Sequence, residues 1–287
     1  MKLPKILNYF FLIILIIIIF ISFFLWRGIC SPKYPSAEDA NFLIKKGESV
    51  EIIADNLQEE GIIKHKYFFI LYILAQKKSA DLIAGEYELS SSMSISEIAE
   101  KITSGDRIKK MITIIEGWTL KDIEEYLDMG EIDPNLEGYL FPDTYEIFPE
   151  DGLKDILEKM KENFEVKITE DLKEEIQFQG KTLEDIIIMA SILEKEVQTL
   201  EDKKTVSGLL WKRINNNMAL QVDAVSDTYK YKGLPPSPIC NSGLNSILAA
   251  IYPMKTKYWF YLSSPDGETI FSTTFKEHQQ AIGEHLK

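Results

Sequence analysis

The strongest constraint on the fold of this chain is a run of apolar residues near its N-terminus. Residues 6–25 are almost entirely Ile, Leu and Phe. At about 1.5 Å per residue, a helix of that length crosses a hydrocarbon layer about 30 Å thick. A cleaved signal peptide has a shorter apolar stretch followed by small residues, whereas Trp26 and Arg27 follow this one. The run therefore predicts one transmembrane helix that is retained as an anchor.

Basic residues flank the predicted anchor on both sides. Lys2 and Lys5 precede it, and Arg27 and Lys33 follow it. With the amino terminus added, the balance slightly favours a cytoplasmic N-terminus. We therefore expect a single-pass protein of the cell membrane, whose remaining residues form an extracytoplasmic body.

Composition excludes several classes of function. The chain carries 45 acidic and 32 basic residues, for a net charge of -13, and this charge disfavours nucleic acid as a partner. Cys30 and Cys240 offer neither a disulfide framework nor a paired zinc motif, and the three histidines lack metalloprotease spacing. A phosphate-binding loop and a dinucleotide fingerprint are also absent from the sequence. We expect no metal and no other cofactor.

Periodicity predicts an α+β fold after the anchor. A strand at 42–44, a helix capped by Ser49, a helix at 65–76 and a strand at 84–89 suggest a small αβ module. Capped helices, an ordered loop at 136–145 and several short strands follow, and the last two strands, at 258–262 and 269–272, are predicted to pair as a hairpin. The predicted organisation is a cytoplasmic stub and anchor at 1–30, a linker at 31–40, the module at 41–115 and a mixed helical and β domain at 116–287.

One predicted helix brings carboxylates to the edge of the core. Thr182 and Asp185 form a capping box, and the residues that follow are apolar on every side, as in a buried helix. The helix ends in Glu194, Lys195 and Glu196. A carboxyl group at the apolar end of a core helix loses hydration, which raises its pKa toward the range of a general acid for glycoside cleavage. The two glutamates lie about 200° apart around the helix, so only one can face a given cleft, and geometry alone leaves both open.

The helix end Ala190–Glu196 has the sequence Ala-Ser-Ile-Leu-Glu-Lys-Glu. It resembles the Ala-Ser-Ile-x-Glu-Lys-Glu motif of the MltG or YceG-like family of endolytic murein transglycosylases, which the chain resembles from about residue 41 almost to its end, and it is the most specific match. Other matching motifs occur in the family's order, at 46–63, 84–98, 116–119, 136–145, 220–223 and 233–243. The first two resemble the family's LysM-like N-terminal module.

The resemblance implies roles for particular residues. It assigns the catalytic acid to Glu196, with Glu194 as the fallback, and places Gln221 and Asp223 on one face of a strand at 220–225 that lines the substrate cleft. Tyr229 is a further substrate-binding candidate. The implied reaction cleaves the MurNAc–GlcNAc bond of nascent peptidoglycan strands, leaves a 1,6-anhydroMurNAc end and contributes to the termination of glycan elongation. Association with cell-wall synthases at the cytoplasmic membrane is implied in the same way.

The sequence also departs from the family pattern. The stretch after Asp223 is short, Asp227 replaces an asparagine, and Thr269 stands where a histidine is expected. These differences leave two alternatives open. One is a hydrolase (muramidase) that uses Asp223 as a second carboxylate. The other is a membrane-tethered peptidoglycan-binding or division scaffold protein without catalytic turnover.

Overall fold

The structure is a computed structural model that describes residues 5–34, 36 and 38–286. Residues 1–4 of the predicted stub, positions 35 and 37 of the predicted linker, and residue 287 lie outside the described residues. The chain forms two compact units. The first runs through Lys110 and also includes Ile147–Glu150, while the second comprises Met111–Glu146 and the chain from Asp151 onward.

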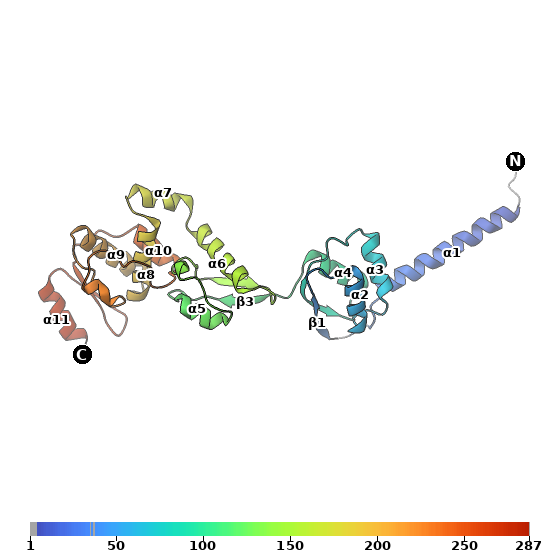
Figure 1. The fold of residues 1–287 in the computed structure, drawn as a ribbon, viewed down its shortest axis with the longest axis horizontal. Helices are drawn as coiled ribbons and strands as arrows, with labels where there is room; N and C mark the ends of the chain where they lie inside the picture. The colour runs from blue at the N-terminus through green and yellow to red at the C-terminus, as the bar shows by residue number, and fades with distance from the viewer. Residues whose placement is uncertain (1–4, 35, 37, 287) are drawn as a thin grey trace. The chain divides into compact units, whose positions relative to one another are not determined.

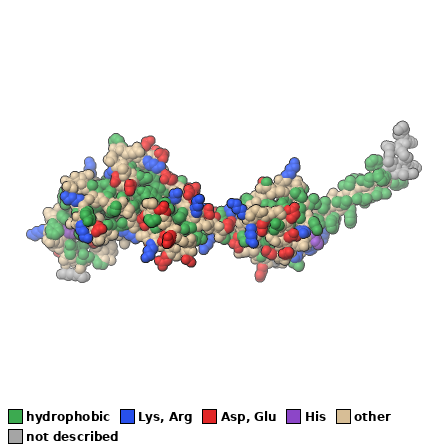
Figure 2. All heavy atoms as spheres, in the orientation of Figure 1, with side chains coloured by type: hydrophobic (Ala, Val, Ile, Leu, Met, Phe, Trp, Pro, Cys, Tyr) green, Lys and Arg blue, Asp and Glu red, His purple; other side chains and the backbone are tan. Residues whose placement is uncertain are grey.

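The first unit begins with a long apolar helix, α1 (Lys5–Cys30). Its segment Tyr9–Cys30 is long and apolar enough to cross a membrane. The large side chains of this segment are exposed, and Figure 2 shows them as a continuous hydrophobic surface along the helix. An exposed surface of this kind requires an apolar environment, as a membrane anchor or a signal sequence near an N-terminus would have.

The rest of the first unit is a small α+β module. Its elements in chain order are β1 (Asp39–Ile44), α2 (Val50–Glu59), α3 (Lys66–Ala75), β2 (Gly85–Ser90) and α4 (Ile95–Ser104). The strands pair antiparallel, with Phe42 opposite Tyr87, and both side chains are buried in the core of the module. Ser49 caps α2 as predicted, by accepting a hydrogen bond from the backbone N–H of Ile52. β1 begins inside the stretch predicted as a linker.

The second unit is mostly helical. In order it contains β3 (Lys110–Thr113, paired with β4), α5 (Leu120–Leu127), the 3-10 turn η1 (Pro134–Leu136), β4 (Thr144–Ile147), α6 (Leu153–Lys167), α7 (Glu170–Phe178), α8 (Leu183–Glu196), α9 (Leu200–Asn215), the 3-10 turn η2 (Ser226–Tyr229), α10 (Leu244–Ile251), β5 (Phe260–Ser263), β6 (Thr269–Ser272) and α11 (Phe275–His285). β5 and β6 form the hairpin that the sequence predicts.

The core of the second unit is built around α8. The helix begins with the predicted capping box of Thr182 and Asp185, and every residue from Ile186 to Leu193 is buried. It contacts α7, α9 and α10, and Figure 1 shows α8, α9 and α10 gathered in one part of the unit. The prediction of a helix that is apolar on all sides, and therefore buried, is confirmed.

Three expectations about local structure are wrong. Residues 220–225 form a turn and not a strand, because Gln221 has a positive φ of 52° that breaks the extended conformation. Helices α10 and α11 occupy stretches expected to contain only short strands and turns. The loop predicted at 136–145 ends earlier than expected, since its last two residues belong to β4.

Candidate active site

The last turn of α8 separates the two candidate glutamates. Glu194 points toward α9 and the start of α10, where its side chain is only 9% exposed. Its Oε1 accepts a hydrogen bond from Lys203 Nζ at 2.8 Å, and its Oε2 accepts one from the backbone N–H of Gly243 at 2.9 Å. Lys203 is also buried, with a side-chain exposure of 5%. Both oxygens of Glu194 are thus held inside the protein by an ion pair and the N-cap of α10.

Glu196 points to the other side of the helix end. Its Oε1 accepts a hydrogen bond from the backbone N–H of Ala224 at 2.8 Å, and its Oε2 accepts one from the hydroxyl of Tyr261 at 2.9 Å. The helix ends directly after it, because Val197 adopts an extended conformation and buries its side chain. The carboxylate is therefore fixed between the turn after residue 220 and the strand β5.

Two hollows in the surface adjoin at Glu196. One, of about 480 Å³, is lined by Glu196, Asp223, Ala224 and Ser263 among others. The other, of about 220 Å³, also includes Glu196 and Ser263 and extends along the β5–β6 turn. The hydroxyl of Ser263 donates to the backbone carbonyl of Glu196 at 2.9 Å, which joins the hairpin to the helix end. A carboxylate thus lies at the junction of two hollows, where an extended ligand could pass it.

Tyr261 was not predicted from the sequence. Burial, together with the nearby carboxylate of Glu196, raises the pKa of its hydroxyl well above the ordinary value. The hydroxyl therefore stays protonated near neutral pH and can donate to Glu196. Its only sequence signal was its position in a predicted hairpin strand, and such a position does not reveal which distant group a side chain contacts.

The three predicted substrate-binding residues differ in whether they reach the hollows beside Glu196. Asp223 lines the larger hollow with Glu196, while Gln221 lines neither hollow. Both side chains are exposed on either side of the buried Val222, and their role in substrate binding stays a prediction. Tyr229 donates a hydrogen bond to Asp223 Oδ1 at 2.6 Å, and this bond is the main cause that raises the pKa of Tyr229 to about 12.

Arg213 on α9 holds both walls of the hollows in place. The guanidinium is buried and donates to the backbone carbonyl of Trp259, just before β5, through Nε at 2.9 Å and Nη2 at 2.6 Å. Its Nη1 donates to the carbonyl of Leu220. One side chain therefore connects the hairpin that carries Tyr261 to the turn that carries Asp223.

A second buried polar side chain, that of Asn241, links segments that are far apart in the sequence. Asn241 is fully buried, and its Oδ1 accepts hydrogen bonds from the backbone N–H groups of Gly138 and Leu140. Its Nδ2 donates to the carbonyl of Trp118 and to Glu137 Oε1. Burial raises the pKa of Glu137, while the hydrogen bond from the N–H of Leu120 opposes the shift. The motifs around residues 118, 137 and 241 are thus joined through one amide side chain.

Trp118 and Tyr139, in the matching motifs at 116–119 and 136–145, are half-buried and pack against other aromatic rings. The ring of Trp118 lies 5.1 Å from that of Tyr126, and the ring of Tyr139 lies 5.4 Å from that of Phe164. Within the part of the chain that the structure describes, no group of three or more His, Cys, Asp or Glu residues is arranged to hold a metal ion.

Comparison with known proteins shows which family the sequence matches. The sequence profile of the YceG-like family matches residues 42–227 and 226–284. The two matched segments meet where the shortened stretch after Asp223 is predicted. Together they cover well over half of the chain.

Relatives and a solved structure extend the comparison. The chain is 28% identical over 311 aligned residues to the endolytic murein transglycosylase of Bacillus subtilis (strain 168), an alignment that covers 88% of this chain and 86% of that protein. It is 23% identical to the endolytic murein transglycosylase of Streptococcus pneumoniae serotype 2 (strain D39 / NCTC 7466), with coverage of 85% of this chain but 58% of that protein. A crystal structure of a yceG-like protein from Listeria monocytogenes is similar with a TM-score of 0.54 and 27% identity, over 85% of this chain and 99% of that one. This chain belongs to the YceG-like family.

Proposed function

We propose that this protein is a membrane-anchored lytic transglycosylase that cleaves the glycan strands of peptidoglycan, with Glu196 as its catalytic residue. The observation that carries the proposal is the position of Glu196 at the junction of two hollows, with one carboxylate oxygen bonded to a backbone N–H and the other to Tyr261. Its neighbour Glu194 is buried in an ion pair and serves the fold. The names of the curated relatives support the same reaction class.

The hydrogen bonds of Glu196 indicate which of its oxygens handles the proton. The N–H of Ala224 is fixed in the backbone and can only donate, so Oε1 remains an acceptor throughout. The hydroxyl of Tyr261 can rotate and can either donate or accept. Oε2 is therefore the oxygen that carries the proton when Glu196 acts as an acid, and Tyr261 adjusts to both states.

The proposed reaction uses this carboxyl group twice. The Glu196 proton passes to the glycosidic oxygen between MurNAc and GlcNAc as the bond to the MurNAc anomeric carbon breaks. The 6-hydroxyl of the same MurNAc then attacks the anomeric carbon and gives its proton back to Glu196. The products are a free GlcNAc 4-hydroxyl and a 1,6-anhydroMurNAc end, and no water is consumed.

We propose the remaining context on the same basis. The segment Tyr9–Cys30 anchors the enzyme in the cell membrane, with the residues that follow it outside the cytoplasm. The module at 41–115 acts as a LysM-like strand-binding element, and the domain at 116–287 carries out the cleavage. Cleavage of nascent strands beside the cell-wall synthases contributes to the termination of their elongation.

The position of Asp223 favours one alternative reaction. It lines the same hollow as Glu196, so it could direct water to the anomeric carbon and make the enzyme a hydrolase. Mass spectrometry of the products distinguishes the two reactions, because an anhydro end is lighter than a reducing end by one water.

Digestion of purified glycan strands by the full-length protein tests the proposal. The expected product carries anhydro ends and is absent with Glu196→Gln. Reducing ends in its place would establish the hydrolase. Digests without new ends, despite retained strand binding, would instead identify a non-catalytic scaffold.

A further inference from the structure

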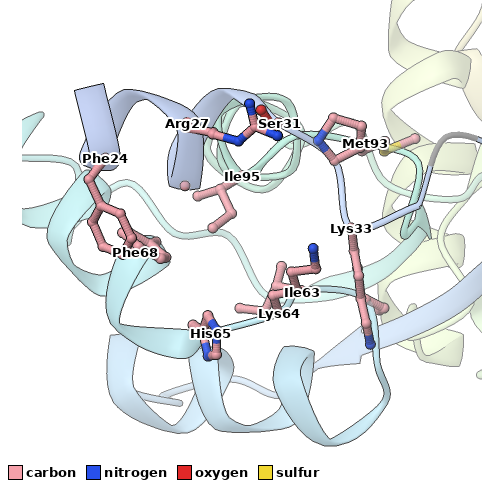
Figure 3. A pocket seen from close by; sticks show the side chains of 13 residues that line it. Phe24, Arg27, Ser31, Lys33, Ile63, Lys64, His65, Phe68, Met93 and Ile95 are labelled. Carbon is pink, nitrogen blue, oxygen red and sulfur yellow. The ribbon is translucent and has the colours of Figure 1, made fainter. Parts of the chain in front are cut away.

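A cavity of about 280 Å³ lies in the first unit at the C-terminal end of α1. The last turns of α1 and the residues that follow form one side, and the loop before α3 together with α3 forms the other. In Figure 3, Arg27 lies above the cavity, Lys64 lies below it and Lys33 lies to its right. None of the functions considered so far uses this cavity.

The cavity collects positive charge without a counterion. Arg27, Lys33 and Lys64 line it, and no Asp or Glu does. Among the residues that the structure describes, Arg27 and Lys64 form no ion pair, and Lys33 Nζ bonds the carbonyl of Gly61 at 2.8 Å. In a chain with a net charge of -13, a cavity whose charged lining residues are all basic favours an anion electrostatically.

The opposite end of the cavity is apolar. Phe24 on α1 and Phe68 on α3 bring their rings to 5.6 Å, and Figure 3 shows them side by side. Gly28 permits this approach, because a Cβ there would lie 2.6 Å from the ring of Phe68. The cavity thus combines cations with aromatic rings that α1 and α3 contribute.

The exposed side of α3 continues this apolar surface. Tyr67 is 73% exposed, Leu74 is 55% exposed and Leu71 is 43% exposed. A helix that contacts the end of a membrane-spanning segment and exposes large apolar side chains is suited to the interfacial layer of a bilayer. Free inorganic phosphate would satisfy the cations but would leave this surface in water.

We propose that the cavity binds the phosphate group of an anionic membrane phospholipid and thereby seats the first unit on the bilayer. Arg27 and Lys64 contact the phosphate, Phe24 and Phe68 border its acyl chains, and the exposed side of α3 lies among neighbouring lipids. The inference rests on the membrane anchoring proposed above. It does not depend on the reaction at Glu196.

Native mass spectrometry of the full-length protein, extracted from vesicles of equal phosphatidylglycerol and phosphatidylcholine, tests the site. Wild-type protein should retain phosphatidylglycerol preferentially. The double variant Arg27→Gln/Lys64→Gln should lose about 30-fold in that preference, because each basic residue near an anionic surface contributes a roughly fivefold effect. The matched control Lys45→Gln/Lys46→Gln removes the same charge from exposed positions of the same unit and should behave as wild type.

Each other outcome has a definite meaning. An equal loss of the preference for phosphatidylglycerol in both double variants would show that any basic residue of the unit attracts the lipid. An unchanged preference in Arg27→Gln/Lys64→Gln would show that the cavity does not bind it. Either result overturns the proposed site. Displacement of phosphatidylglycerol by inorganic phosphate would show that the cavity binds an anion without recognising a lipid, and it would overturn the lipid assignment. Carbonate extraction of the membranes reports separately on the anchor.

Discussion

Removing the charge of each glutamate at the end of α8 should have opposite consequences for stability and activity. In Glu196→Gln the amide oxygen can still accept from the N–H of Ala224, and the amide nitrogen can donate to the hydroxyl of Tyr261. The fold should therefore be preserved. Cleavage should fall at least about 10²–10⁴-fold, which is the usual contribution of a general acid or base, and toward the upper end because this one group transfers the proton twice.

Glu194→Gln should instead destabilise the second unit. The substitution leaves the ammonium of Lys203, with a side-chain exposure of only 5%, without its partner at 2.8 Å. Removal of one member of a buried ion pair costs about 3–5 kcal/mol. For a unit of this size, about 2–4 °C of melting temperature is lost per kcal/mol, so the expected decrease is roughly 6–20 °C.

A double substitution separates the ion pair from other effects. Adding Lys203→Met to Glu194→Gln removes the unpaired charge, so most of the lost melting temperature should return. Scanning calorimetry and cleavage of purified strands, measured on the same four proteins below their melting temperatures, provide the assay. The assignment is refuted if Glu196→Gln cleaves normally while Glu194→Gln is stable but inactive.

Three further predictions follow from the contacts around the site. Arg213→Lys should lower the free energy of unfolding by about 1.5–3 kcal/mol for each charged hydrogen bond that is lost, and these bonds include the two to the carbonyl of Trp259. An unchanged free energy of unfolding in urea would contradict this role of Arg213. Tyr261→Phe should reduce kcat about tenfold with little effect on KM, since it removes one hydrogen bond of about 1.4 kcal/mol to Glu196; an unchanged kcat would contradict its positioning role. Burial raises the pKa of Glu137, so the native state retains a proton that the unfolded chain releases. The free energy of unfolding should therefore fall as the pH rises from 4.5, the ordinary pKa of this group, through its raised pKa in the native state. Glu137→Gln should remove this decrease, and equal pH slopes in urea unfolding of the two proteins would count against it.

The sequence predicted those elements whose stability is mainly local. Capping boxes specified where α5 and α8 begin, and apolar residues on every side of α8 required a buried helix. Glycine in the left-handed conformation ended α4 at residue 105. α11 also begins with a capping box, of Thr274 and Glu277, so the sequence contains a local signal for its start.

Other elements have no such local signal. α10 has eight residues, and its N-cap is Gly243, which has no side chain to accept a capping hydrogen bond. Its stability comes from packing against α8 and α9. The turn at 220–225 likewise depends on Thr228, whose hydroxyl accepts a hydrogen bond from the N–H of Val222 at 3.0 Å and donates to the carbonyl of Val225 at 2.6 Å. The alternation of apolar and polar residues from 220 to 223 is therefore typical of a strand, although none of the described strands pairs with this segment.

The sequence by itself determined that a buried helix would end in two carboxylates and that an apolar helix would precede the folded body. Only the tertiary structure decided that Glu194 meets Lys203 and the N-cap of α10, whereas Glu196 meets Ala224 and Tyr261. The physical reason is the range of the interactions. Helix formation and capping act within a few residues, but the environment of each carboxylate is set by segments that are far away in the chain and reach it only after the core has packed.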